Sequence, residues 1–247
     1  MNIGIDVDGV IFDTERLIKF QAEIYDLLFL RKKGATDKSG MYPDERYKNS
    51  WLRNHLDHFK IAFLKPLCKE ANLIPGAKSI ITWLKEDGNT LVIISARGTR
   101  EITGARDLHK IALQSFKKHG LTFDEYCWGQ LSKVDACKKY NIDLMIDDSP
   151  SVCKELSENG IKTLYFRDVN MKKLKPNENL IEVNNWAEVY REYLAMIPPE
   201  MQEQCVAMHQ KEIYPPHILN PNFYNAIKAR KQIYHQPTEE PNKPEKQ

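Results

Sequence analysis

The chain has 247 residues, of which 42% are hydrophobic and 28% charged, so it can bury one large core or a core with an inserted domain. Its 36 Lys and Arg nearly balance its 34 Asp and Glu, and the net charge of +2 argues against nucleic acid polymers or an anionic membrane as partners. The longest mainly apolar run, near residues 24–30, is much shorter than the roughly 20 residues of a membrane span.

The cysteines and the first residues of the chain indicate in which cellular compartment the protein is expected. The five cysteines are scattered and form no CxxC pair, and no basic segment precedes a cleavable apolar one. We therefore expect reduced thiols and a cytoplasmic protein. The sequence gives no sign of the oligomeric state.

The first thirteen residues predict a short buried strand that ends in acid. An apolar run over residues 3–5 leads to Asp6 and Asp8, and a glycine and a second apolar run follow. Because alternate residues of an extended chain share a face, the two carboxylates are expected to point the same way. Carboxylates that close repel each other unless a cation or a shared proton is present.

Residues 14–74 are expected to form a small helical insertion. Apolar residues spaced three and four apart predict one helix over 14–33 and another over about 44–69, with a polar, turn-rich segment between them. The insertion has twelve Lys and Arg against eight Asp and Glu, so it is the positive part of the chain. That charge suits an anionic substrate, although a solvated helix surface explains most of it.

From residue 75 the pattern changes to strands that alternate with helices. We expect strands at 90–94, 125–128, 143–146 and 162–166, and helices at 75–88, 100–118, 133–140, 151–159 and 186–196. Short connections between such elements predict an α/β fold, a Rossmann-like parallel sheet with helices on both faces. We assign 1–13 and 75–197 to this core, 14–74 to a cap inserted after the first strand, and 198–247 to a C-terminal extension.

The extension differs in composition from the rest of the chain. It contains eight of the thirteen prolines, and its last part has no apolar residue, so we expect that part to be disordered. Its middle part contains aromatic and aliphatic residues that could pack on the body or on a partner. A second interpretation is therefore a binding or assembly module that acts through residues 198–235.

Three of the predicted strands end in groups that can do chemistry. In chain order these are Asp6 with Asp8, Ser95 with Arg97, and Asp147 with Asp148. Ligands bind outside the carboxyl ends of the strands in an open parallel sheet, so these groups and Lys133 converge on one pocket if the strands are neighbours. Several carboxylates in a small space require a cation, and their hard oxygen atoms suit Mg²⁺. Ser95 and Lys133 could then hold a phosphoryl group.

Each of these signals also has an ordinary structural explanation. Ser95 could cap the following helix, and the segment 147–150 could simply begin one. Lys133 competes with Lys138 and Lys139 of the same predicted helix for the role of buried lysine. Arg97 fits a contact with phosphate and a pairing with an acid equally well.

Taken together, the segments resemble the four motifs of the haloacid dehalogenase-like (HAD) hydrolase superfamily. The matching residues, in the expected order, are DVDGV at 6–10, the strand that ends in Ser95, Lys133, and IDD at 146–148. The resemblance covers about residues 2–196. The phrases SAR and IDDSP look most like the 5′(3′)-deoxyribonucleotidase-like group and its bacterial relatives.

The resemblance implies a Mg²⁺-dependent phosphatase that acts on a small phosphorylated metabolite, with a nucleoside monophosphate favoured. It implies that Asp6 is the nucleophile that forms an aspartyl-phosphate and that Asp8 is the general acid and base. Mg²⁺ would be held by Asp6, the backbone carbonyl of Asp8 and one of Asp147 and Asp148, and we prefer Asp148.

The remaining matched residues would bind the substrate phosphate: Ser95, Lys133 and, as an option, Arg97. Phosphotransfer to another acceptor, as in mutases, stays open because it would use the same aspartyl-phosphate. The acid at position 8 disfavours the dehalogenase branch of the superfamily.

Overall fold

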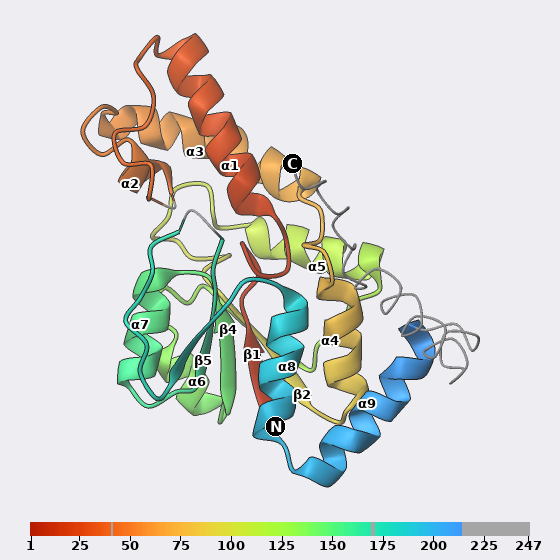
Figure 1. Cartoon of the computed structure of the whole chain (residues 1–247). Coiled ribbons are helices and arrows are strands. Elements are labelled where there is room, and N and C mark those ends of the chain that lie inside the picture. Colours follow the sequence, from red (N-terminus) through yellow and green to blue (C-terminus); the bar gives the residue numbers. More distant parts are fainter. Residues whose placement is uncertain (41, 169–170, 214–247) are drawn as a thin grey trace, which may run out of the picture. The chain divides into compact units, whose positions relative to one another are not determined.

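The structure is a computed structural model that describes residues 1–40, 42–168 and 171–213, with the backbone alone for 211–213. Its central element is a six-stranded sheet in the order β3-β2-β1-β4-β5-β6 (Figure 1). The strands are β1 (Asn2–Ile5), β2 (Thr90–Ser95), β3 (Glu125–Trp128), β4 (Leu144–Asp147), β5 (Thr163–Phe166) and β6 (Leu180–Val183). Every neighbouring pair is parallel, which confirms the predicted α/β fold class.

The strand order places β1 at the centre of the sheet, between β2 and β4. Ile5 at the end of β1 is in register with Ile93 of β2 and with Ile146 of β4. The three strands whose carboxyl ends carry polar groups, β1, β2 and β4, are therefore neighbours, as expected. Since the strand order reverses at β1, their carboxyl ends border the crevice in which ligands bind in such sheets.

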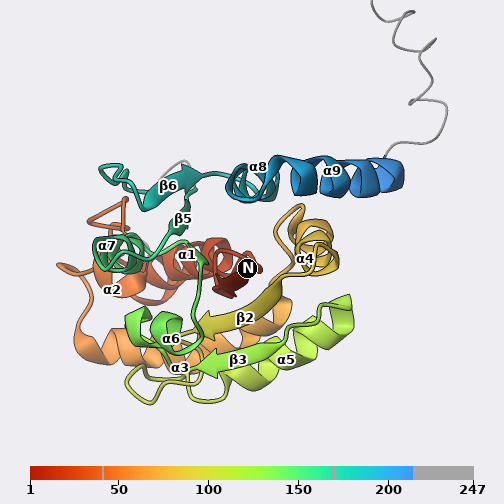
Figure 2. The same cartoon turned by 90° about the horizontal axis from the view of Figure 1, so that it is seen from below.

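Helices cover both faces of the sheet (Figure 2), and the strands at its centre are therefore buried on both sides. The helices α6 (Val134–Lys139) and α7 (Pro150–Glu158) pack on one face, against Val92, Ile94 and Met145. The helices α4 (Ala77–Glu86) and α8 (Trp186–Met196) lie on the other face, where the Trp83 and Tyr190 rings meet edge to face at 5.4 Å.

Between β1 and α4 the described chain forms a helical insertion. It consists of α1 (Thr14–Ile24), a π-helical turn (Tyr25–Phe29), α2 (Pro43–Arg46) and α3 (Arg53–Glu70). The carboxylate of Asp26, which is fully buried, accepts hydrogen bonds from the Trp51 indole at 2.6 Å and the Gly34 amide at 2.7 Å. These bonds draw the chain back after α1, so the first helix ends earlier and the long second helix begins later than the apolar spacing predicts.

The helix α5 (Leu108–His119) starts eight residues later than the prediction of residue 100. Residues 96–107 form a loop instead, with φ of +93° at Gly98 and +81° at Gly104, values that a helix cannot contain. The loop contacts the insertion, because Thr103 Oγ1 donates to Asp57 Oδ1 of α3 at 3.1 Å. A Cβ atom on Gly104 would lie 3.0 Å from the Lys60 carbonyl, so the close approach requires glycine there.

Chain contacts divide the molecule into two units, Met1–Leu194 and Ala195–Gln247. The second unit contains α9 (Pro199–Ile213), which the composition of this segment does not predict. The predicted disorder and most of the predicted docking segment lie beyond residue 213, outside the described residues. Among the helices of the described ranges, none combines the length and apolar character that a transmembrane helix requires.

Candidate active site

Three buried carboxylates meet at the carboxyl edge of the sheet. Asp6 follows β1, Asp147 ends β4 and Asp148 comes directly after it, and one oxygen from each lies within 4.8 Å of the others. All three residues are at most 7% exposed. The neighbouring positions of β1 and β4 in the sheet therefore create the acid cluster from segments 140 residues apart.

Lys133, directly before α6, supplies the cluster with a positive charge. Its Nζ atom lies 2.7 Å from Asp6 Oδ1 and 2.5 Å from Asp147 Oδ2. Burial opposes the charged form, but the two carboxylates outweigh it and raise the pKa of Lys133 above its usual range. Lys138 and Lys139 are exposed, so the structure brings Lys133 and not its two competitors to the predicted site.

Asp147 and Asp148 have different surroundings although they are adjacent in sequence. Asp147 accepts from Lys133 and from the Ser149 amide at 2.9 Å. Asp148 is 1% exposed, and the partner of its carboxyl group is the neighbouring carboxyl group of Glu15, not a basic side chain. Burial, and then the nearby carboxylate of Glu15, raise the pKa of Asp148 well above its ordinary value. Asp148 is thus the member of the adjacent pair that no buried cation of the described chain neutralises.

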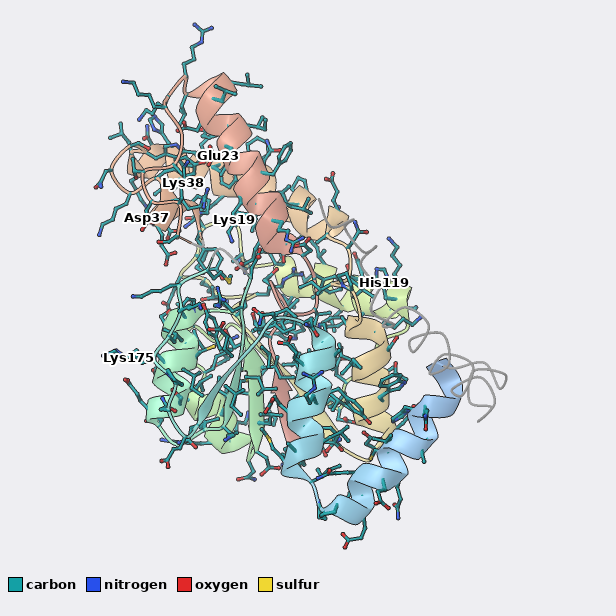
Figure 3. The ribbon with its side chains drawn as sticks, in the orientation of Figure 1. Lys19, Glu23, Asp37, Lys38, His119 and Lys175 are labelled. Atoms are coloured by element: carbon teal, nitrogen blue, oxygen red, sulfur yellow. The ribbon has the colours of Figure 1, made fainter. Side chains whose placement is uncertain are left out.

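Glu15, in the first turn of α1, is a site residue that the sequence analysis missed. It is 4% exposed, its Oε1 atom has no hydrogen-bond partner among the described residues, and its Oε2 atom lies 3.8 Å from Lys19 Nζ. Lys19 lies on the half of α1 that is nearer the sheet (Figure 3). Burial raises the pKa of Glu15 to about 8. A sequence signal existed, because position 15 continues the buried helical face of Ile18, Ala22 and Tyr25.

Asp8 is held by an arginine and a threonine. Arg97 donates from Nε to Oδ2 at 2.8 Å and from Nη2 to Oδ1 at 2.6 Å, and Thr14 Oγ1 donates to Oδ1 at 2.5 Å. Burial opposes ionisation of Asp8, but the charge and hydrogen bonds of Arg97, together with Thr14, lower its pKa. Of the two interpretations of Arg97, the structure shows the pairing with an acid. Its Nη1 atom is buried without a hydrogen-bond partner in the described chain.

Ser95 and Gly9 complete the surroundings of the cluster. Ser95 is 1% exposed at the end of β2, and its Oγ atom accepts from the Arg97 amide at 3.2 Å. Gly9 has a φ of +72°, and a Cβ atom there would lie 1.7 Å from Asp148 Oδ2. The glycine after Asp8 therefore leaves the space that the Asp148 carboxylate occupies.

The charge balance and the donor set both fit a divalent cation. Five acids gather here, namely Asp6, Asp8, Glu15, Asp147 and Asp148, against the two buried cations Lys133 and Arg97. Two adjacent buried carboxyl groups, Glu15 and Asp148, are unfavourable unless they share a proton or a cation lies beside them, so their juxtaposition is an observation that a bound cation would explain. Carboxylate oxygens at this density suit Mg²⁺, and Asp6 and Asp148 would hold it.

Comparisons of the sequence alone identify no relatives. No protein-family model matches the chain. A comparison with curated proteins likewise found no match.

Comparisons of the structure, in contrast, find solved proteins with the same fold. A haloacid dehalogenase-like family hydrolase from Streptococcus pneumoniae superimposes with a TM-score of 0.57 at 17% identity, over 78% of this chain and 97% of that chain. A predicted phosphoglycolate phosphatase from Haemophilus somnus gives 0.52 at 17% identity, over 78% and 97%. A candidate β-phosphoglucomutase from Thermotoga maritima gives 0.51 at 17% identity, over 80% and 100%. The chain therefore has the fold of HAD-like hydrolases, and at this identity the similarity establishes the fold alone.

Proposed function

We propose that this protein is a Mg²⁺-dependent phosphatase that hydrolyses a small phosphomonoester. The observation that carries the proposal is the buried cluster of Asp6, Asp147 and Asp148, in which Asp148 has a second carboxyl group, Glu15, as its neighbour and no basic partner in the described chain. The fold supports it, because phosphatase and phosphoglucomutase descriptions both occur among the solved structures that share it.

In this proposal the Asp6 carboxylate attacks the phosphorus atom and forms an aspartyl-phosphate, the P–O bond to the alcohol breaks, and the leaving oxygen takes its proton from the protonated form of Asp8. Lys133, 2.7 Å from Asp6, holds the carboxylate in place and offsets the charge of the incoming phosphoryl oxygens. Ser95, at the end of the adjacent strand, offers a hydroxyl to one of those oxygens. Mg²⁺ held by Asp6 and Asp148 would neutralise phosphoryl charge in the transition state.

Asp8 is the candidate for proton transfer, because it lies two residues after the nucleophile on the same edge of the sheet. The Arg97 and Thr14 contacts fix its orientation and lower its pKa, which suits the second step, in which Asp8 takes a proton from the water that attacks the phosphorus atom. That step breaks the bond between Asp6 and phosphorus, releases inorganic phosphate and returns Asp8 to the protonated form that the first step uses. The unpartnered Nη1 atom of Arg97 is a donor that the phosphate or the ester oxygen could use.

Phosphate release from a panel of monophosphates, with acetyl phosphate included, tests the proposal. We expect hydrolysis with Mg²⁺, none with excess EDTA, and a loss of at least about 10³-fold in kcat for Asp6→Asn, as removal of a nucleophile requires. Asp135→Asn is the matched control, since Asp135 is an exposed residue of α6. Full activity of Asp6→Asn, or no hydrolysis of any compound, would show that the proposal is wrong.

Phosphoryl transfer to a second alcohol is the other candidate reaction. One structure that shares the fold is described as a β-phosphoglucomutase, and the same aspartyl-phosphate would serve both reactions. Product analysis with added alcohols separates them, because a transferase yields a new ester and a hydrolase only phosphate. The resemblance of the sequence favours nucleoside monophosphates as substrates, and the pocket beside Asp8 bears on that choice.

A further inference from the structure

A pocket of about 170 Å³ opens beside Asp8 and Arg97, between the helical insertion and the loop that follows β2. Asp8, two positions after Asp6, and Arg97, which donates to the Asp8 carboxylate, are among its polar lining residues, so the pocket begins beside the acid cluster. An ester whose phosphate sits at Asp6 would therefore place its alcohol portion in this pocket. The inference drawn from it rests on the proposed function.

The pocket lining is mainly apolar. Ile18 of α1, Phe59 and Leu64 of α3, and Leu108 of α5 line it together with Ile102 and Ala105 of the loop. Further charge comes from Lys60 and Asp44, which pair with each other at 3.8 Å, and from Glu15. A substrate with several hydroxyl groups would leave most of them without partners here, which is costly for a buried polar group.

Tyr42 also lines the pocket, and it is 37% exposed. Its ring contributes an aromatic surface to the pocket. Two aromatic residues, Tyr42 and Phe59, therefore border a space near the reacting centre.

The volume limits how much of a ligand the pocket can enclose. A cavity of about 150 Å³ lined by apolar residues holds one benzene molecule, so about 170 Å³ accommodates a single six-membered ring or a branched chain of similar size. The pocket is partly open, so a purine nucleoside, with its sugar and fused two-ring base, would leave much of its surface outside it. The apolar lining and this incomplete enclosure both disfavour nucleosides as the leaving group.

We infer that the substrate of this site is the phosphate monoester of a compact, largely apolar alcohol, with at most one six-membered ring, rather than a nucleoside monophosphate or a sugar phosphate. The apolar residues of the insertion and the loop select the alcohol by excluding water from it. The acid cluster acts only on the phosphate.

Two esters with rings of the same size test the inference. Cyclohexylmethyl phosphate and glucose 6-phosphate both present a six-membered ring on a primary phosphoester, and they differ chiefly in the hydroxyl groups. We expect kcat/KM for cyclohexylmethyl phosphate to exceed that for glucose 6-phosphate and for AMP by at least about 100-fold, since each unpaired hydroxyl costs roughly tenfold. A higher kcat/KM for glucose 6-phosphate or AMP would overturn the inference and leave the phosphatase proposal intact.

Binding gives a readout that does not depend on turnover. Calorimetry with the Asp6→Asn protein and Mg²⁺ should show tighter binding of cyclohexylmethyl phosphate than of glucose 6-phosphate or AMP. If no ester, acetyl phosphate included, is hydrolysed, the proposed function is wrong, and the same binding order still decides the inference. Equal or reversed affinities would refute it.

Filling the pocket provides a further check. Ile102→Trp places a large side chain at a loop position, and we expect KM for cyclohexylmethyl phosphate to rise at least about tenfold, with a smaller change for acetyl phosphate. Ile61→Trp is the matched control, because Ile61 is 68% exposed on α3, and it should leave both KM values unchanged. An equal effect on the two substrates in Ile102→Trp would contradict the assignment of the pocket.

Discussion

Asp148 and Asp147 are adjacent aspartates for which the structure predicts opposite effects of the same substitution. Asp148 is buried beside the Glu15 carboxyl group with no basic partner in the described chain, whereas Asp147 is bound by Lys133 and the Ser149 amide. In metal-free protein at pH 7 we expect Asp148→Asn to stabilise the fold and Asp147→Asn to destabilise it. The first removes the free-energy cost of keeping a buried carboxyl group protonated at pH 7, and the second removes a partner of a buried ammonium.

The magnitude for Asp148→Asn follows from proton linkage. The pKa of Asp148 is raised from 3.8, so the folded state retains a proton that the unfolded chain loses as the pH rises through about 4. Stability is therefore lost between that pH and the raised pKa, and at pH 7 the upper limit is about 4 kcal/mol, at 1.36 kcal/mol for each pH unit. Because the amide also needs partners, we expect a gain of about 1–3 kcal/mol. For Asp147→Asn we expect a loss of about 3 kcal/mol.

Urea unfolding in EDTA measures both effects. At pH 7 Asp148→Asn should be more stable than the wild type, and the difference should shrink as the pH falls through about 4, below which the carboxyl group is protonated in both states. Thermal unfolding provides a second readout, because a stability change of 1 kcal/mol shifts the Tm by about 2–4 °C in a chain of this size. Added Mg²⁺ should raise the Tm of the wild type more than that of Asp148→Asn.

Two results would refute the reasoning. One is a loss of stability in Asp148→Asn that equals the loss in Asp147→Asn in EDTA. The other is an equal Mg²⁺-induced rise of Tm in Asp148→Asn and the wild type, which would mean that Asp148 does not bind the cation.

Three other substitutions have effects that the structure predicts. Gly9→Ala should lower the stability by at least about 2 kcal/mol and weaken the Mg²⁺-induced rise of Tm, because its Cβ atom would collide with the Asp148 carboxylate. Gly88→Ala is the control, because Gly88 has φ +84° and nothing lies within 4 Å of a Cβ atom there. It should lower the stability by only about 1–2 kcal/mol in the same thermal assay and keep the rise of Tm. Trp51→Phe should cost about 1–3 kcal/mol in urea unfolding, because it removes a donor to buried Asp26, and an unchanged stability would contradict that bond. Lys133→Met should cost about 3–5 kcal/mol at pH 7 and less at pH 5, because burial raises the pKa of Asp6 to about 6 and this partner can take up a proton there; equal losses at both pH values would argue against its ion pair with Lys133.

Elements with a local signal can be predicted from the sequence. An apolar run followed by acid predicts a strand and its chemistry together, and this pattern places Asp6, Ser95 and Asp147 at strand ends. Strands β1 to β5 lie within about one residue of their predicted bounds, because each is a short apolar run between turn signals. The edge strand β6 was missed, since Leu180 and Val183 are its only fully buried residues and its pattern is weak.

Only the tertiary structure decided the partners of the polar groups and the ends of the cap helices. No local pattern shows that Arg97 binds Asp8, that Asp147 is neutralised while Asp148 is not, or that Glu15 turns into the acid cluster. Hydrogen bonds and charge interactions of this kind depend on distances between segments up to about 140 residues apart, which follow from the order of strands in the sheet. The pocket beside Asp8 has the same origin, because its lining comes from α1, α3, α5 and the loop after β2 at once.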